Sequence, residues 1–360
     1  MKYYAGIDIG GTNISTGIVD ENYEIVGRAK IKTDVSRGYK GILPDIVQSV
    51  RDAAENAELE LEEIRWIGIG CPGTCNPETG VVEYSNNLRW DNVPLLADVE
   101  AALGRKAYLD NDANAAGYGE YLAGAAKGAK NAVIITLGTG VGAGIIINGK
   151  IFSGSNFAGG EIGHTVITVD GYECTCGRKG CFEAYSSATG LVRMTREAAE
   201  QHPESKIRQL VEADGRISAR TAFNAAKMLD DTGIEVVNRY IKHLACGIAN
   251  TINVFQPDIL CIGGGVCNEG DNLLTPLKKE VANQIYSKNS ENTNMRKEAK
   301  RMFAGIEDVE LKRKQHPDAE IIRHPECNMD VQEACDKVLS TGGMLKYIAQ
   351  SDKKESAVRI

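Results

Sequence analysis

The sequence predicts a two-domain α/β protein with a cleft between the domains. Its 360 residues exceed the usual size of a single hydrophobic core. A glycine turn between two apolar strands occurs twice, once near residue 10 and once near residue 140. Helical periodicity follows each of these strand-turn-strand units. A unit that recurs along the chain indicates two domains of similar plan.

The first domain is expected to begin with two strands joined by a glycine turn. Tyr3–Ile9 alternates as a strand, Gly10–Asn13 interrupts it, and Ile14–Val19 resumes the apolar pattern. Three more elements are predicted after this unit: an extended stretch at Glu24–Lys32, a helix at Ile42–Ala57 and a short buried strand at Trp66–Ile69.

The second domain is expected to repeat this beginning. Ala132–Leu137 reads as a strand, Gly138–Gly142 as a glycine turn and Ala143–Ile147 as a second strand. Helices are predicted at Ala184–Glu200, Ser218–Asp230 and Gly233–Val254, and a strand from Ile259 ends in the glycine cluster Gly263–Gly265.

Composition and charge exclude several classes of protein. The net charge of −8, with no basic stripe, argues against nucleic-acid binding. No apolar run is long enough to cross a membrane, and the first residues lack a secretory signal. Ten cysteines without such a signal favour a reducing cytoplasm, with no disulfides.

A metal site is predicted between residues 159 and 183. One imidazole and three thiolates form the ligand set of a closed tetrahedral zinc site, supplied by His164, Cys174, Cys176 and Cys181. Because protein fills all four positions, the zinc would have a structural role. The loop that it shapes carries Glu161 and Glu183, two carboxylates that could contact a substrate. The alternative is a zinc loop that only stabilises its own domain.

The glycine turns are candidate phosphate-binding sites. Main-chain amides approach a phosphate freely where glycine replaces a side chain, and several amides in one concavity bind an anion. The first turn offers Asp8, Gly10, Gly11, Thr12 and Asn13, and the second offers Gly138, Thr139 and Gly140. Each turn alone could be an ordinary hairpin. Together they could hold a nucleotide's phosphates, with Asp8 binding Mg²⁺ through water.

Asp112 is the candidate general base. Tyr108–Asp110 ends a strand, and Asn111 and Asp112 open a helix that is predicted to reach about Ala126. Asp112 could therefore cap this helix. It could instead accept a hydroxyl proton during phosphoryl transfer, beside the Asn111 amide. Sugar hydroxyls need several polar partners, and the candidates are Asn87, Asn111, Glu161, His164 and Glu183.

Eight ordered motifs resemble the ROK family of bacterial sugar kinases and sugar-responsive repressors, and within it the ATP-dependent glucokinases. The resemblance runs from about Ala5 to Asn294. The motifs are D-I-G-G-T-N from Asp8, C-P-G-T from Cys71, S-N-N-L-R-W from Ser85, N-D-A-N-A-A from Asn111, L-G-T-G-V-G-A-G from Leu137, G-G-E-I-G-H from Gly159, C-T-C-G-R-K-G-C-F-E from Cys174 and I-G-G-G-V from Ile262.

The resemblance implies an actin-like ATPase fold, which is ribonuclease H-like, with ATP and sugar meeting in the interdomain cleft. Residues 1–112 would form the first domain and residues 113–294 the second. Asp112 matches the catalytic base. Sugar-contacting positions match Gly73, Asn87, Asn111, Glu161, His164 and Glu183, and nucleotide-contacting turns match Gly10–Thr12, Gly138–Gly140 and Gly263–Gly265. The family also implies a homo-oligomer, either a dimer or a tetramer.

A glucose kinase is the favoured function within this family. Repressors of the family carry a winged helix-turn-helix before the first phosphate turn, and only a few residues precede Asp8 here. Kinases for N-acetylglucosamine, N-acetylmannosamine, allose and fructose share most of the motifs, so these substrates remain alternatives. A sugar sensor without catalytic activity is a further alternative.

The segment 295–360 departs from the family pattern, which ends in a helix that packs on the first domain. From about residue 304 it resembles part of quinolinate synthase, through H-P-D-A-E-I-I-R-H-P-E-C-N from His316 and S-T-G-G-M-L-K-Y-I from Ser340. The cysteine that matches Cys327 binds an iron-sulfur cluster there. A cluster needs three thiolates from separate segments, so none is expected here. The segment reads as a chimeric or misjoined end, or as an ordinary appendage.

Overall fold

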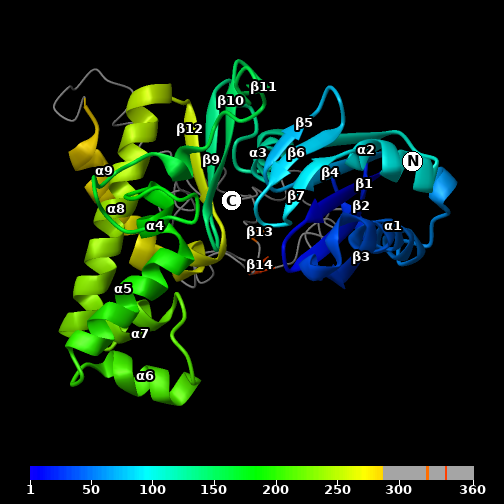
Figure 1. Ribbon diagram of the computed structural model, residues 1–360. Coiled ribbons are helices and arrows are strands. Elements are labelled where there is room, and N and C mark those ends of the chain that lie inside the picture. The colour runs from blue at the N-terminus through cyan, green and yellow to red at the C-terminus, as the bar shows by residue number, and fades with distance from the viewer. Residues whose placement is uncertain (287–321, 324–336, 339–360) are drawn as a thin grey trace. The chain divides into compact units, whose positions relative to one another are not determined.

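The computed structural model describes residues 1–286, 322–323 and 337–338 (Figure 1). The chain forms two compact units. The first unit contains Met1–Ala132 and Ala143–Gly160, and the second contains Val133–Gly142 and the described residues from Glu161 to Tyr286. The predicted boundary at Asn294 lies outside the described residues. The predicted division after residue 112 stays a prediction.

A five-stranded sheet forms the core of the first unit, in the order β3-β2-β1-β4-β8. Strand β1 runs antiparallel to β2 and parallel to β4, and β4 runs parallel to β8. Alternate residues of β1, including Ile7 and Ile9, are buried, as the period of two predicts. The strands are β1 (Tyr3–Ile9), β2 (Asn13–Asp20), β3 (Ile25–Lys32), β4 (Ile64–Cys71) and β8 (Ala107–Asn111).

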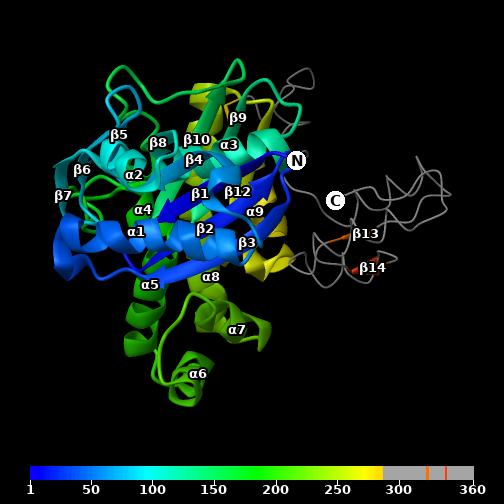
Figure 2. The same cartoon turned by 90° about the vertical axis from the view of Figure 1, so that its right-hand side faces the viewer.

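Helix α1 (Gly38–Glu55) covers one face of this sheet. Figure 2 shows it running along β2 and β3. Ile42, Ile46 and Val50 recur at intervals of four residues and are fully buried on one side of α1. Helix α2 (Leu95–Leu103) packs beside α1 and was not predicted.

A small antiparallel sheet completes the first unit. Its strands are β5 (Thr74–Asn76), β6 (Val81–Ser85) and β7 (Trp90–Val93). Helix α3 (Asp112–Ala123) begins directly after β8 and packs against β4. The end of β8 therefore delivers Asn111 and Asp112 to the carboxyl ends of β1 and β4, where the glycine turn also begins.

The second sheet has the order β11-β10-β9-β12. Its strands are β9 (Ala132–Leu137), β10 (Val141–Ile147), β11 (Lys150–Ile151) and β12 (Ile259–Gly263). Five of the six residues of β9 are buried, so this strand is apolar on both faces. The glycine turn lies between β9 and β10, as predicted.

Helices of the second unit gather around α8 (Asp231–Phe255), which contacts α4, α5, α6, α7 and α9 (Figure 1). The remaining elements described are α4 (Phe182–Ser186), α5 (Ala188–Gln201), α6 (Lys206–Asp214), α7 (Thr221–Lys227) and α9 (Asp271–Gln284), the 3-10 turns η1 (Val35–Arg37), η2 (Leu61–Glu63), η3 (Ile162–His164) and η4 (Gly265–Glu269), and the paired strands β13 (Ile322–Arg323) and β14 (Lys337–Val338). Within the described residues, no helix combines the length and the apolar character that crossing a bilayer requires.

Most predicted elements are present, with one correction in the second unit. Strands β1 and β9 have the predicted bounds. The predicted helix Ala184–Glu200 is divided at Ser187, where α4 ends and α5 begins. The extended backbone of Ser187 lets its hydroxyl accept a hydrogen bond from the Gly190 amide at 3.0 Å, which caps α5. The 3.6-residue period continues across this break, so periodicity did not reveal it.

Candidate active site and metal centre

The first glycine turn joins β1 to β2 and is held from β3. The Gly10 amide donates to the Asn13 carbonyl at 2.8 Å, which closes the turn. Thr33, just after β3, donates its hydroxyl to the Gly10 carbonyl and its amide to the Thr12 carbonyl, both at 2.8 Å. Thr33 is buried, so these bonds are shielded from water. The turn thus has a fixed backbone.

Asp8 and Asp112 lie near each other beside this turn. Burial raises the pKa of the Asp112 carboxyl above its ordinary value of 3.8. A hydrogen bond from the Ala113 amide at 2.8 Å opposes this shift, and the negative charge of Asp8 adds to it. Asp8 is exposed as a residue, yet desolvation by the surrounding protein also raises the pKa of its carboxyl. The pair can hold a cation or exchange a proton.

Asn111, and not Asp112, caps helix α3. The Asn111 Oδ1 accepts the Ala113 amide at 2.9 Å and the Asn114 amide at 3.2 Å. Its Nδ2 donates to the Gly73 carbonyl at 3.1 Å. Since capping is done by Asn111, the alternative that Asp112 serves as the cap is wrong. The Asn111 amide keeps one N–H for another partner.

Asn87 lies beside the first turn. A side chain at Gly11 would place its Cβ 3.4 Å from the Asn87 carbonyl oxygen. The structure therefore brings six predicted residues together around the turn: Asp8, Gly10, Gly11, Thr12, Asn13 and Asn87. Gly73, Asn111 and Asp112 form a neighbouring set at the start of α3.

The four predicted metal ligands converge in the second unit. Their ligand atoms all lie within 4.8 Å of one another, in the set His164, Cys174, Cys176 and Cys181. The His164 Nδ1 lies 3.6 Å from the Cys174 Sγ, and the sulfurs of Cys176 and Cys181 are 3.7 Å apart. Tetrahedral zinc with bonds of about 2.3 Å to sulfur separates two sulfurs by about 3.8 Å. The spacing of the donor atoms fits such an ion.

Local backbone structure sets the positions of these ligands. His164 ends η3, and Cys181 is the N-cap residue of α4. The loop between them folds back on itself, because the Cys174 amide donates to the Arg178 carbonyl at 2.8 Å. A bridge between Val166 and Cys181 joins the two ends of the loop. Ligands that are separated along the chain by up to 17 positions, from 164 to 181, therefore meet.

The second glycine turn is held by the segment that follows the last metal ligand. Glu183 Oε2 accepts the Val141 amide at 3.0 Å. The Ala188 amide donates to the Gly138 carbonyl at 2.9 Å, and the Thr189 hydroxyl donates to the Thr139 carbonyl at 2.8 Å. Sequence reasoning assigned Glu183 to a sugar and missed these bonds. No local pattern marks Thr33 or Thr189, since each bonds to a segment far along the chain.

The third glycine cluster lies against the second turn. An ideal Cβ on Gly264 would be 2.4 Å from the Leu137 carbonyl oxygen, and Gly264 has a φ of +97°. Only glycine suits this position. Leu137 immediately precedes Gly138, so the structure places the predicted turns Gly138–Gly140 and Gly263–Gly265 side by side.

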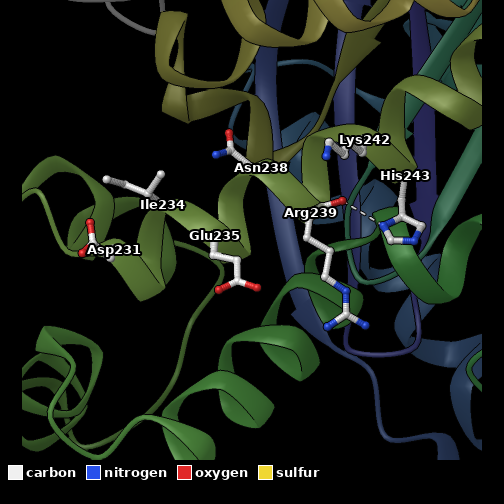
Figure 3. A pocket seen from close by; sticks show the side chains of 7 residues that line it. All are labelled: Asp231, Ile234, Glu235, Asn238, Arg239, Lys242 and His243. Atoms are coloured by element: carbon white, nitrogen blue, oxygen red, sulfur yellow. Dashed lines mark hydrogen bonds between the residues drawn. The ribbon is translucent and has the colours of Figure 1, made fainter.

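One groove lies apart from these residues. A groove on α8 is lined by Asp231, Ile234, Glu235, Asn238, Arg239, Lys242 and His243 (Figure 3), and it contains none of the predicted site residues. The predictions for Cys327 and for the rest of the quinolinate synthase-like segment fall outside the described residues, apart from the backbone of β13 and β14.

Comparison with known protein families shows which family the chain belongs to. The model of the ROK family matches residues 4–307, most of the chain. The chain belongs to the ROK family. A second family model, described as quinolinate synthetase A protein, matches residues 282–360 and overlaps the first. The predicted family and the predicted tail resemblance are both confirmed, although each match extends further than the motifs indicated.

Individual ROK relatives include kinases and a repressor. The glucokinase of Thermotoga maritima is 35% identical over 281 residues, which cover 78% of this chain and 87% of that protein. A crystal structure of a ROK family glucokinase from Streptomyces griseus, in complex with glucose and AMPPNP, is 33% identical with a TM-score of 0.70 and covers 80% of this chain and 91% of that one. The xylose repressor of Caldicellulosiruptor bescii is 31% identical over 283 residues, covering 78% of this chain and 69% of the repressor. The predicted α/β actin-like fold is confirmed by these structural relatives.

Proposed function

We propose that this ROK family member phosphorylates glucose at its 6-hydroxyl, with ATP as the donor. The observation that carries the proposal is Asp112, a half-buried carboxylate at the start of α3 that lies beside Asp8, while Asn111 is the N-cap residue. The similarity to glucokinases supports this assignment of the substrate.

Asp112 acts as the general base. The glucose 6-hydroxyl oxygen forms a bond to the γ-phosphorus of ATP, the bond to the bridging oxygen breaks, and ADP leaves. Asp112 takes the hydroxyl proton as this bond forms. Mg²⁺, bound near Asp8, would neutralise charge on the phosphates.

The glycine turns are proposed to bind the nucleotide. The first turn presents main-chain amides beside Asp8, and its backbone is fixed by Thr33. The turns Gly138–Gly140 and Gly263–Gly265 adjoin each other in the second unit, which suits binding of one nucleotide by both.

The zinc loop is proposed to carry sugar-binding groups. Zinc would be held by His164 and the three cysteines as a closed structural site. With zinc on the His164 Nδ1, which lies 3.6 Å from the Cys174 sulfur, Nε2 would carry the ring proton and would donate to a sugar hydroxyl. Glu161, Glu183, Asn87, Asn111 and Gly73 complete the proposed sugar contacts. A cytoplasmic homo-oligomer is the proposed form of the protein.

A coupled assay of ADP release tests the proposal. Glucose, N-acetylglucosamine, N-acetylmannosamine, allose and fructose are each supplied with Mg·ATP, with and without a zinc chelator. We expect the highest kcat/KM with glucose. A higher kcat/KM with another sugar would change the substrate but keep the kinase. If none of the five sugars led to ADP release, the proposal would be overturned.

A sugar sensor is the second candidate, and the similarity to the xylose repressor is the observation that favours it. Such a protein binds sugar without turnover. Calorimetry that detects glucose binding in a preparation that produces no ADP would support the sensor and exclude the kinase.

A further inference from the structure

The segment from Cys181 to Thr189 touches both the metal cluster and the second glycine turn. Cys181 is a ligand of the cluster and the N-cap of α4. Glu183 lies two residues later, and Ala188 and Thr189 begin α5. All of these residues belong to the second unit.

Both carboxylate oxygens of Glu183 are engaged within the chain. Oε2 accepts the Val141 amide at 3.0 Å, at the end of the turn. Oε1 accepts the Thr175 hydroxyl at 3.2 Å and lies 3.7 Å from the Cys174 sulfur. One side chain therefore bonds to the metal loop and to the turn at the same time.

The contact between Glu183 and the turn leaves little space. A Cβ on Gly140 would lie 2.3 Å from Glu183 Oε2, so a side chain at residue 140 would push the carboxylate away. Val141 and Glu183 are 42 positions apart, and the bond between them fixes the end of the turn to α4. A displacement of α4 would therefore displace the turn.

We infer that Glu183 is a positioning residue that couples the metal loop to the nucleotide turn, so that zinc in the loop tightens nucleotide binding at Gly138–Gly140. This inference rests on the proposed function of the turn and of the cluster. Loss of zinc releases Cys174 and Cys176, which flank Thr175, and Thr175 no longer holds Glu183 against Val141. The coupling is a free energy between two sites and is measurable in either direction.

Calorimetry with Mg·AMPPNP, without sugar, tests the coupling on the full chain. We expect zinc removal to weaken nucleotide binding to the wild-type protein about tenfold, the size of effect typical of one charge-assisted hydrogen bond. Glu183→Ala should bind as weakly as the zinc-free wild type and should show no further loss when zinc is removed. Glu173→Ala, an exposed carboxylate on the same loop, is the matched control and should keep the full zinc dependence.

A second pair of variants serves if Glu183→Ala does not fold. Thr175→Val keeps the metal ligands and the turn intact but removes the hydroxyl that bonds to Glu183. It should retain zinc and lose most of the zinc dependence of nucleotide binding, whereas Thr175→Ser should behave as the wild type. A full zinc dependence in Thr175→Val would overturn the inference.

The outcomes separate this inference from the proposed function. A wild-type protein that binds AMPPNP equally with and without zinc, and that phosphorylates glucose, overturns the coupling alone. A full zinc dependence in Glu183→Ala does the same. A wild-type protein that binds no AMPPNP overturns the proposed function and the coupling with it.

Discussion

The two strand-turn-strand units share a pattern in the sequence, but different contacts hold their turns. The first turn is bonded within its own sheet, because Thr33 follows β3 and reaches Gly10 and Thr12. The second turn is bonded to the helices that follow the metal cluster, through Glu183 and Thr189. Two similar glycine turns are therefore held by hydrogen bonds from different kinds of element.

The carboxylates beside the two turns also differ. Asp8 and Asp112 stand beside the first turn, and burial raises the pKa of both. Glu183 stands beside the second turn with both oxygens bonded. The comparison indicates that the first turn is next to the proposed chemistry and that the second is next to a structural brace.

The largest expected effect is at the first turn. Asp112→Asn should lower kcat by about 10² to 10⁴, because the variant lacks the general base. Glucose binding by calorimetry should persist, since Asn111 still caps α3. A nearly normal kcat in this variant would show that Asp112 is not the general base.

At the metal loop, Cys176→Ser should weaken zinc retention and raise the KM for glucose together, each by about tenfold or more. Zinc content after dialysis and steady-state kinetics measure the two effects. Cys246→Ser, a half-buried cysteine outside the cluster, should change neither. Separate responses of zinc content and KM would show that the loop and the sugar site are independent.

The glycine cluster beside the second turn tests how tightly that region is packed. Gly264→Ala should lower the free energy of unfolding by about 2 kcal/mol, because its φ is +97° and its Cβ would meet the Leu137 carbonyl. Gly265→Ala has open space at its Cβ and should change it by less than about 0.5 kcal/mol. Urea denaturation measures both variants. Equal effects would contradict the close packing of the cluster on β9.

Thr33 tests the support of the first turn. Thr33→Val removes the hydroxyl that donates to the Gly10 carbonyl and should raise the KM for ATP roughly fivefold, the equivalent of about 1 kcal/mol. Thr33→Ser keeps the hydroxyl and should retain the wild-type KM. If zinc removal changed the KM for ATP of Thr33→Val and of the wild type by different factors, the supports of the first and second turns would not be independent.

The smallest expected effect is a shift in the pH dependence of kcat/KM. Asp112 is active when deprotonated, so kcat/KM should fall as the pH falls through the raised pKa of its carboxyl. This acid limb should lie above the ordinary carboxyl pKa of 3.8. Asp8→Asn removes a negative charge and should move the limb to lower pH, whatever its effect on the rate. An acid limb at or below a pH of 3.8 would contradict the raised pKa that partial burial gives the Asp112 carboxyl.

The sequence by itself determined the strands that border the glycine turns, the turns themselves and the composition of the metal cluster. Alternation predicted β1 with its bounds, since burial on a sheet has a period of two, and a short continuous apolar run before a glycine turn predicted β9. The spacing and chemistry of one histidine and three cysteines predicted the cluster that the structure assembles. These signals are local, or are carried by residue types with few other uses.

Only the tertiary structure decided which side chains cap the helices and which hold the glycine turns. It showed that Asn111 caps α3, that Ser187 divides the predicted helix, and that Glu183 bonds to Val141 across 42 positions. The two caps are local bonds that hydrophobic periodicity does not detect. The bond between Glu183 and Val141 depends on where distant segments meet, and periodicity along one segment holds no information about the other. The sequence predicts Glu183 as a sugar contact, and only the fold shows that its carboxylate also bonds to the second glycine turn.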